Sequence, residues 1–312
     1  MFFFMSRTGI YIEAPAKINL YLRVLGRRSD GYHQLATLMQ KLALYDRLEL
    51  EPVEGGVSLE CPDSNLPVNE ENIVLRAALL FRSSLQDRLP DNFGLRIILR
   101  KNIPVAAGLG GGSSDAAAVL TGLDRLFRTG CSRHELAMLG LQLGADVPFF
   151  IYDWPVAWAT GIGEQLTAAQ GLEDGTVLLV NPGFPVSTKW VYENLPLTLK
   201  EKDFNLTDSR SQGDDCQVKN PFRQSFFRSR DVLNDLELVT EGSFKEISLI
   251  KEQLLAAGAD SALMSGSGPT VFGIFSKVEK AQTCYLEMLK RYSRTFLVSP
   301  LPNGGGAFGG KV

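Results

Sequence analysis

The feature that most constrains this chain is a run of glycines between a strand-like and a helix-like segment. Residues 104–120 read PVAAGLGGGSSDAAAVL. Residues 95–104 alternate like a strand until proline stops them, and residues 116–126 carry one apolar helical face. A strand, a glycine-rich loop and a helix start place free backbone N–H groups and the positive helix end around one small volume. We therefore predict a phosphate site, with the helix beginning at Ser113 or Ser114.

Two common phosphate-binding motifs do not fit this loop. A Walker A motif ends in Gly-Lys-Ser/Thr, whereas residues 112–115 read Gly-Ser-Ser-Asp. A dinucleotide fingerprint requires a third glycine at position 113, where this chain has serine. A flexible interdomain linker is the plainer alternative. It is disfavoured because linkers rarely separate a clean strand from an alanine-rich helix.

Length and composition indicate a two-domain enzyme-sized protein. The chain has 312 residues and 45% hydrophobic content, which is more than one compact core usually holds. The net charge of -3 is spread without long runs of one sign, so we expect neither nucleic acid nor a membrane as partner. The N-terminus lacks the pattern of a signal peptide, and the four cysteines lie far apart in sequence. We expect a soluble cytoplasmic protein without a zinc site or a disulfide framework.

The order of predicted elements favours an α+β fold. Strand-like runs occupy residues 11–26, and helices are expected in residues 71–86 and after the capping-box pair Ser132 and Glu135. The second half alternates as a separate unit: the expected strands are 176–183, 270–275 and 295–301, and the expected helices are 244–259 and 280–292. Residues 200–230 show no period and are predicted to be a long loop or insertion, and the glycine-rich C-terminus is predicted to be a flexible tail.

Three motifs in this order resemble those of the GHMP kinases. They are PAKINL at 15–20, the loop pattern Pro-x-x-x-Gly-Leu-Gly from Pro104, and SGSGPTVFGIF at 265–275. The stretches at 29–46 (SDGYHQLATLMQKLALYD) and 143–150 (LGADVPFF) are similar to one branch of that family. Members of this branch phosphorylate a cytidine diphosphate derivative of methylerythritol, in the methylerythritol phosphate route to isoprenoids. The resemblance covers roughly residues 10–195 and 230–301.

The resemblance implies an architecture and a reaction. It implies an N-terminal ATP-binding lobe like domain 2 of ribosomal protein S5, expected over 1–165, and a ferredoxin-like C-terminal lobe over 166–312. It implies a phosphotransferase with an alcohol acceptor, dependent on ATP and Mg²⁺, acting on a small molecule as a monomer or weak homodimer. Kinases for homoserine or mevalonate, and a non-catalytic nucleotide sensor, remain as alternatives. The sensor would lose Lys17 or Asp146, and this chain has both.

The family's catalytic pair maps onto Lys17 in PAKINL and Asp146 in LGADVPFF. By resemblance, Asp146 is the base for the acceptor hydroxyl and Lys17 is its partner. An ammonium beside a carboxylate orients it and attracts the moving phosphoryl group. The plainer alternatives are a turn residue for Asp146 and an exposed strand lysine for Lys17.

The resemblance also implies a nucleotide site. Asn72 is expected near the adenine, Lys101 beside the loop, and Ser114 in contact with magnesium, although a hydroxyl at a helix start is more often a cap. We expect Asp115 to face away from the nucleotide. The residues expected to bind ATP are Asn72, Lys101, Pro104, Gly108, Leu109, Gly110, Gly111, Gly112, Ser113 and Ser114.

On the acceptor side, Tyr32 and His33 follow an Asp-Gly turn signal and are expected to bind cytosine by stacking and hydrogen bonding. Tyr192 is the expected second aromatic residue, with Trp190 as the alternative, and Asn19 is expected to hold the acceptor beside the base. The turn formed by Gly266, Ser267 and Gly268 is expected to support the phosphate loop.

Overall fold

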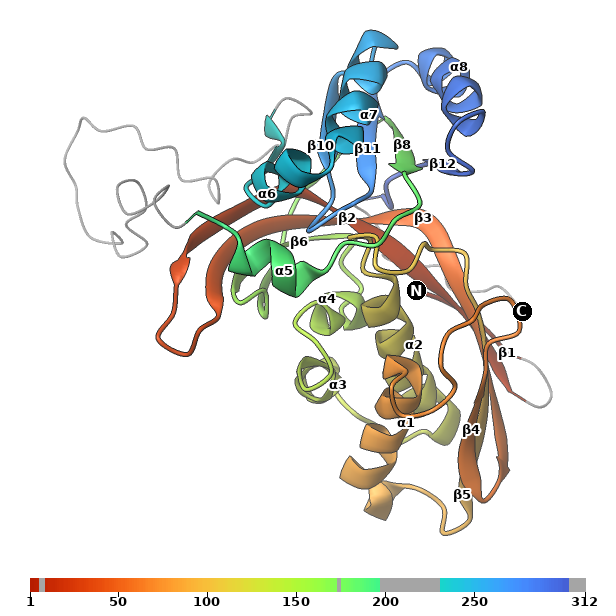
Figure 1. Cartoon of the computed structure of the whole chain (residues 1–312). Helices are drawn as coiled ribbons and strands as arrows, with labels where there is room; N and C mark the ends of the chain where they lie inside the picture. The colour runs from red at the N-terminus through yellow and green to blue at the C-terminus, as the bar shows by residue number, and fades with distance from the viewer. Residues whose placement is uncertain (6–8, 173–174, 197–230, 303–312) are drawn as a thin grey trace.

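The computed structural model describes residues 1–5, 9–172, 175–196 and 231–302. Its strands form two sheets that lie face to face, with helices on both outer sides (Figure 1). The residues expected to form a long loop, 200–230, and most of the expected tail lie outside the described residues. Among the described residues, none of the helices is long and apolar enough to cross a membrane.

The first sheet is built on one long hairpin. Its strands β2 (Ile10–Arg27) and β3 (His33–Glu54) pair antiparallel along almost their whole length. Sequence reasoning expected β2 as two shorter runs and gave no secondary structure to β3. The sheet order is β1-β2-β3-β5-β4, with β6 on β3, β7 on β6 and β9 on β2. The remaining strands are β1 (Phe2–Met5), β4 (Gly56–Glu60), β5 (Phe93–Arg100), β6 (Val156–Gly161), β7 (Gln165–Ala168) and β9 (Leu233–Asn234).

Four helices pack against the outer face of this sheet: α1 (Ile73–Ser84), α2 (Gly111–Phe127), α3 (Arg133–Leu141) and α4 (Val147–Ile151). A short 3₁₀ turn, Gln86–Arg88, follows α1. The central helix α2 is alanine-rich and almost fully buried, because small side chains let it lie close to its neighbours. The capping box expected at Ser132 and Glu135 is present at the start of α3.

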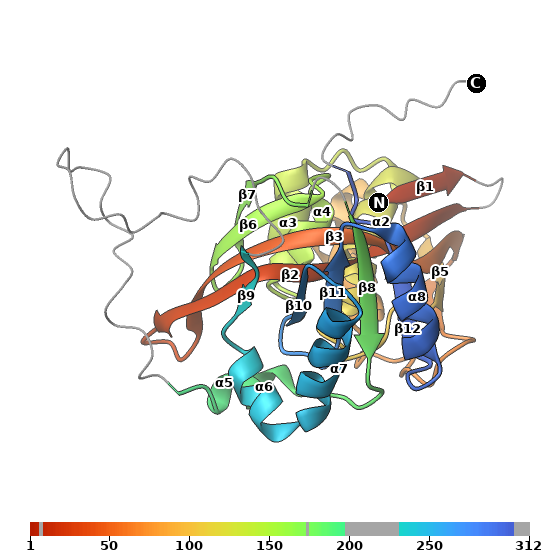
Figure 2. The same ribbon diagram turned by 90° about the horizontal axis from the view of Figure 1, so that it is seen from above.

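The second sheet has the strand order β10-β11-β8-β12, and all its pairs are antiparallel. Its strands are β8 (Thr176–Asn181), β10 (Ser261–Met264), β11 (Val271–Phe275) and β12 (Arg294–Val298). Helices α7 (Lys245–Ala256) and α8 (Val278–Leu289) cover its outer face, as Figure 2 shows from above. This order is the ferredoxin-like topology, so the expected α+β fold class is confirmed. The short helices α5 (Thr188–Glu193) and α6 (Glu237–Ser243) lie beside it.

A shared core joins the two sheets. Ile18 and Leu42 of the first sheet and Leu179 and Phe272 of the second belong to one buried apolar cluster. Strand β9 also returns to pair with β2 after the chain has left the first sheet. The domain boundary predicted between residues 165 and 166 falls at the start of β7, a strand that belongs to the first sheet. The exact domain boundary stays a prediction.

Candidate active site

A cavity of about 600 Å³ lies where the glycine-rich loop meets both sheets. Lys17, Asp146 and residues 104–113 line it from the N-terminal part, and Tyr192 and Ser267 line it from the C-terminal part. The loop therefore forms a wall of a cavity to which both halves of the chain contribute. The expected nucleotide residues lie on this wall, except Ser114, which is fully buried and does not line the cavity.

The glycines of the loop are required by its backbone and by its contacts. Gly108 has φ +76°, and a Cβ there would stand 2.0 Å from the carbonyl oxygen of Ser265. Gly110 has φ +70°, and a Cβ there would stand 2.9 Å from Cγ of Lys17. A side chain at either position is therefore excluded for two reasons: L-residues rarely adopt such φ values, and the Cβ would lie too close to a neighbouring atom. The loop is held from the other side by a bond from the Lys17 N–H to the Leu109 carbonyl, at 2.9 Å.

Helix α2 begins two or three residues earlier than expected. Its first residue is Gly111 and its N-cap is Gly110, which supplies no side-chain cap. The expected start at Ser113 or Ser114 is therefore wrong, and neither serine occupies the N-cap position. The reason is that glycine at 110 takes the left-handed conformation that turns the chain into the helix. The first N–H groups of α2 have no capping side chain and are available to an anion.

An irregularity in strand β2 turns Lys17 toward the cavity. Ile12 and Ala14 pack under the helices, whereas Ala16 and Ile18 pack between the two sheets. The pairing register shifts between Pro15 and Ala16, and this shift inverts the faces of the strand. Lys17 and Asn19 therefore lie on the cavity side of the strand.

Lys17 and Asp146 form an ion pair in this cavity. Nζ of Lys17 lies 3.4 Å from Oδ2 of Asp146, and their side chains are 5% and 38% exposed. Lys17 is thus not an exposed strand lysine. The same Nζ donates to Oδ1 of Asn19 at 2.6 Å, and Nδ2 of Asn19 donates to Thr37 at 2.8 Å. Asp146 stands at the N-cap of α4 without a capping bond, so its carboxylate is not used by that helix. The carboxylate is positioned and accessible, as a proton acceptor must be.

The turn after β10 supports the loop from behind. Oγ of Ser265 donates to the carbonyl of Gly108 at 2.9 Å and accepts from the N–H of Asn19 at 3.3 Å. Gly266 and Gly268 have φ +56° and +84°, and Gly266 and Ser267 line the cavity. A single serine thus connects β2, the phosphate loop and the second sheet.

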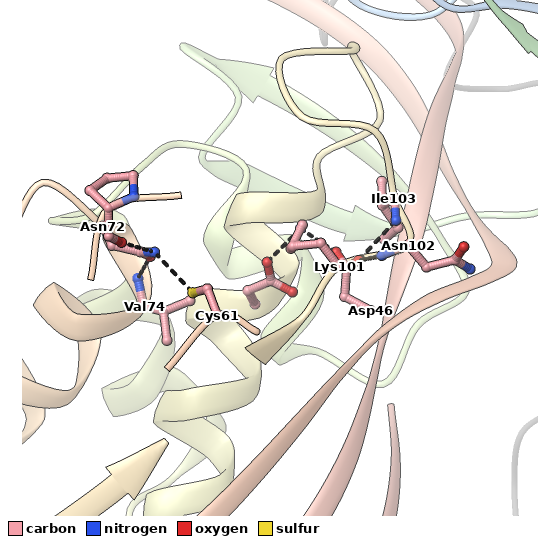
Figure 3. A network of polar contacts seen from close by, with 9 residues as sticks. Asp46, Cys61, Asn72, Val74, Lys101, Asn102 and Ile103 are labelled. Carbon is pink, nitrogen blue, oxygen red and sulfur yellow. Dashed lines mark hydrogen bonds and ion pairs between the residues drawn. The ribbon is translucent and has the colours of Figure 1, made fainter. Parts of the chain in front are cut away.

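The nucleotide side also contains a buried charged cluster (Figure 3). Nζ of Lys101 donates to Asp46 and to Asp115, the latter at 2.7 Å. Burial raises the pKa of Asp115, and the Lys101 ammonium opposes that rise. Asp115 lines the cavity wall, and one of its oxygens bonds toward Lys101. Asp46 ends the stretch 29–46 that resembles the family, but no role was predicted for it from the sequence.

Asn72 is the N-cap of α1. Its Oδ1 accepts from the N–H of Val74 at 3.0 Å, and its Nδ2 donates to the carbonyl of Pro67 at 2.8 Å and contacts Cys61 (Figure 3). It also lines the cavity. Because its side chain already has protein partners at both ends, its main evident role is to fix the start of α1 at the edge of the nucleotide site.

On the acceptor side, His33 and Tyr192 stack on each other with ring centroids 5.1 Å apart and planes inclined by 24°. Burial, and secondarily Arg27, lowers the pKa of His33, and burial, and secondarily Asp146, raises the pKa of Tyr192. Tyr192 lines the cavity, whereas Trp190 packs edge-on against Phe244. Of the two residues that the sequence left open as the second aromatic residue, Tyr192 therefore lines the cavity and Trp190 does not. Tyr32 is 61% exposed and does not line the cavity.

Thr188 was not found from the sequence. Its hydroxyl lies 2.8 Å from that of Ser267, and both residues line the cavity. Thr188 opens helix α5, so its only signal in the sequence is the Ser-Thr pair of a helix start, which is common and indicates no ligand.

The oxygen atoms near the loop are of the kind that magnesium prefers. Asp115, Asp146 and Ser113 line the cavity, and the buried hydroxyl of Ser114 has no hydrogen-bond partner among the described residues. No group of three or more His, Cys, Asp or Glu side chains in the described part of the chain could hold a metal by itself.

Comparison with known proteins agrees with this geometry. The model for the GHMP kinase N-terminal domain matches residues 72–153, and that for the GHMP kinase C-terminal domain matches residues 220–294. The 4-diphosphocytidyl-2-C-methyl-D-erythritol kinase of Syntrophotalea carbinolica is 49% identical over 290 residues, which cover 92% of this chain and 98% of that protein.

Solved structures give the same result. A crystal structure of 4-(cytidine 5'-diphospho)-2C-methyl-D-erythritol kinase superposes with a TM-score of 0.74 at 34% identity, covering 95% of this chain and all of that one. Homoserine kinase from Cytophaga hutchinsonii superposes with a TM-score of 0.67 at 18% identity, over 98% of both chains, which is a likeness of fold. By its motifs, its two lobes and these relatives, the chain belongs to the GHMP kinase family.

Proposed function

We propose that this protein transfers the γ-phosphoryl group of ATP to the 2-hydroxyl of 4-diphosphocytidyl-2-C-methyl-D-erythritol. The observation that carries the proposal is the buried Lys17, 3.4 Å from Asp146, between a backbone-lined anion site and an aromatic pair. The relatives that bear this name cover almost the whole chain. The product enters the methylerythritol phosphate route to isoprenoids.

The proposed reaction is a direct displacement at phosphorus. The acceptor hydroxyl oxygen forms a bond to the γ-phosphorus while the bond from that phosphorus to the β–γ bridging oxygen breaks, and ADP leaves. The hydroxyl proton passes to the carboxylate of Asp146. Lys17 orients this carboxylate and stabilises the charge on the transferring group, and Asn19 fixes the Lys17 ammonium.

ATP is proposed to bind with its phosphates on the N–H groups at the start of α2. Residues 108–112 give close backbone approach, and the Lys101 ammonium, which is paired with Asp46 and Asp115, lies beside them. Magnesium would spread the charge of the phosphates. Contact of Ser114 with this ion stays a prediction from the resemblance: its hydroxyl has no hydrogen-bond partner among the described residues, but it is buried behind the cavity wall and does not line the cavity.

The cytosine of the acceptor is proposed to bind beside the stacked pair of His33 and Tyr192. Both rings offer a stacking face, and a neutral imidazole both donates and accepts hydrogen bonds along a base edge. Tyr32, which is largely exposed at the end of the hairpin, is proposed to close over the base. We expect the protein to act in the cytoplasm as a monomer or weak homodimer.

The proposal is tested by a coupled assay of ADP release with Mg-ATP. The cytidyl acceptor, homoserine and mevalonate are compared side by side. We expect turnover with the cytidyl compound alone. Turnover only with another alcohol would keep the kinase and refute the cytosine site. Binding of ATP without turnover of any of the three would favour a nucleotide sensor.

A further inference from the structure

A charged cluster lies beside the phosphate loop, and Figure 3 labels two of its residues, Asp46 and Lys101. It consists of Asp46 on β3, Lys101 just after β5, and Asp115 in α2. The side chains are 0%, 8% and 2% exposed. The cluster therefore joins three elements around the loop with little exposure, and Lys101 and Asp115 also line the cavity.

Asp46 is the centre of this cluster. Its Oδ1 accepts the backbone N–H groups of Asn102 and Ile103, at 2.6 and 2.9 Å, and its Oδ2 accepts from Lys101. Residues 101–103 are the segment where β5 ends and the phosphate loop begins. One carboxylate thus binds three consecutive residues and fixes the path of the chain as it enters the loop.

Lys101 carries this constraint to the helix. Its Nζ bonds to Asp115, in the first part of α2, and would lie 3.2 Å from a Cβ built on Gly111. Oδ2 of Asp46 would lie 3.3 Å from the same Cβ. The Asp46–Lys101 pair therefore packs directly against the first residue of α2, the helix whose first N–H groups are proposed to bind the phosphates.

We propose that Asp46 is a positioning residue for the nucleotide: it fixes the entry of the phosphate loop and the Lys101 ammonium against the start of α2, and thereby sets the affinity for ATP. This rests on the proposed function, because it takes the loop as the ATP site. Asp46 does not touch the nucleotide itself. It acts through Lys101 and the backbone of residues 102 and 103.

A purely structural ion pair is the competing interpretation. Buried ion pairs often contribute little net stability, because desolvation of both charges offsets their attraction. A structural pair would change the amount or the thermal stability of folded enzyme. A positioning residue also changes one substrate's affinity and leaves the other's unchanged. The hydrogen bonds of the cluster connect it to the start of the phosphate loop, at residues 102 and 103, and to α2. Among the described residues, no hydrogen bond connects it to Asn19, Lys17 or Tyr192.

The test is Asp46→Asn, which keeps the size of the side chain and removes its charge. Asp63→Asn is the matched control, since Asp63 pairs with Arg100, the residue before Lys101, and both side chains are 54% exposed. For Asp46→Asn we expect the Kd for Mg-ATP, by calorimetry without acceptor, to rise about tenfold. The KM for ATP rises equally, while kcat and the KM for the acceptor stay within about twofold. The control leaves all four unchanged.

An unchanged Kd for Mg-ATP in folded Asp46→Asn protein would overturn the inference, as would equal losses for both substrates. If Asp46→Asn does not fold, Asp46→Glu is used. This variant keeps the charge but displaces the carboxylate by one methylene, so it is expected to weaken ATP binding in the same selective way. The calorimetric measurement needs no turnover, so it tests the role of Asp46 in ATP binding independently of which acceptor the enzyme uses. Wild-type protein that does not bind ATP at all would instead refute the proposed function.

Discussion

At the scale of single residues, the proposed chemistry depends most on Asp146. For Asp146→Asn we expect kcat to fall by about 10² to 10⁴, because an amide cannot accept the hydroxyl proton. The Kd for ATP should stay within about twofold, since the group acts mainly in the transition state. Single-turnover kinetics together with calorimetry measure the two quantities.

Asp153→Asn is the control for this variant. Asp153 lies close in sequence, is 68% exposed and pairs only with Arg133 among the ion pairs of the described residues. It should leave kcat unchanged. An Asp146→Asn enzyme with wild-type kcat would remove Asp146 from the mechanism.

Lys41 is a second residue with a measurable consequence. It is buried, donates to the carbonyl of Tyr152 at 2.7 Å and lies over the ring of Phe149. Burial lowers its pKa to about 7 from 10.5, while Asp153 raises it and Arg133 lowers it. Because the folded pKa is depressed, the stability linked to neutral Lys41 is present above 10.5 and is lost as pH falls toward 7.

Lys41→Met removes this dependence. We expect the Tm of the variant relative to wild type to increase as pH falls from about 9 to about 6, measured by calorimetric scans. Lys290→Met, at a side chain that is 69% exposed, is the control and should show no such trend. A Tm difference that does not change with pH would contradict a buried lysine with a depressed pKa.

Residues in recognisable motifs could be predicted from the sequence, whereas buried charged residues within a long strand could not. Lys17 and Asp146 stand in motifs that resemble those of the GHMP kinases, so the resemblance predicted that they lie together. Asp46 and Lys41 lie in a long strand whose pattern marks them only as polar positions. Their partners, Lys101 and Tyr152, are 55 and 111 residues away in the chain. No local pattern encodes a contact of that kind.

At the scale of elements, the phosphate loop tolerates change unevenly. Gly108→Ala would place a Cβ 2.0 Å from a backbone carbonyl at φ +76°, so it should lower Tm and weaken ATP binding. Gly112→Ala is the matched variant in the same segment, because its Cβ would meet only Ile73 at 3.6 Å. Gly112→Ala should raise the unfolding free energy by about 0.5–1 kcal/mol, since alanine favours a helix over glycine. Equal effects on stability would contradict this account.

The contact between hairpin and helix α5 predicts a pH effect on the acceptor alone. The folded pKa of His33 is lowered below its ordinary 6.5, mainly by burial, so the neutral ring dominates at pH 7. As pH falls through that lowered pKa, the ring becomes charged and loses the acceptor nitrogen with which it would read the base. The acceptor KM should therefore rise in acid, while the KM for ATP does not share this titration. In His33→Gln the acid rise should be absent, and its persistence would exclude His33 as its source.

Elements with a clear period were predictable. The capping box of α3, helix α7 and strand β11 lie close to their expected positions. The predicted start of α2 was wrong because serine is a favoured N-cap residue, whereas the loop needs a residue in the left-handed conformation at the N-cap, which is Gly110. The first half of strand β3 gives no alternation to read, because residues 35–42 are buried on both faces; residues 43–50 do alternate, and this signal was missed.

At the scale of the whole molecule, the apolar cluster between the sheets couples the two lobes. Phe272 is fully buried in it. We expect Phe272→Ala to lower the unfolding free energy by about 3–5 kcal/mol and to keep one transition, with far-UV circular dichroism and tryptophan fluorescence coinciding. Leu286→Ala, at a side chain that is 60% exposed on α8, should change little. Two separate transitions would show that the lobes unfold independently.

The loop's dependence on backbone rather than side chains bears on how such a site diverges and on how it is inhibited. The proposed nucleotide cradle is made of main-chain N–H groups and glycines, which a protein cannot alter gradually without losing the loop. The proposed acceptor side is made of side chains: Tyr192 lines the cavity, and His33 stacks on Tyr192 without lining the cavity itself. A new acceptor therefore needs only a few substitutions at one end of the cavity. An inhibitor that occupies the aromatic end should discriminate between members of the family, whereas one confined to the cradle should not.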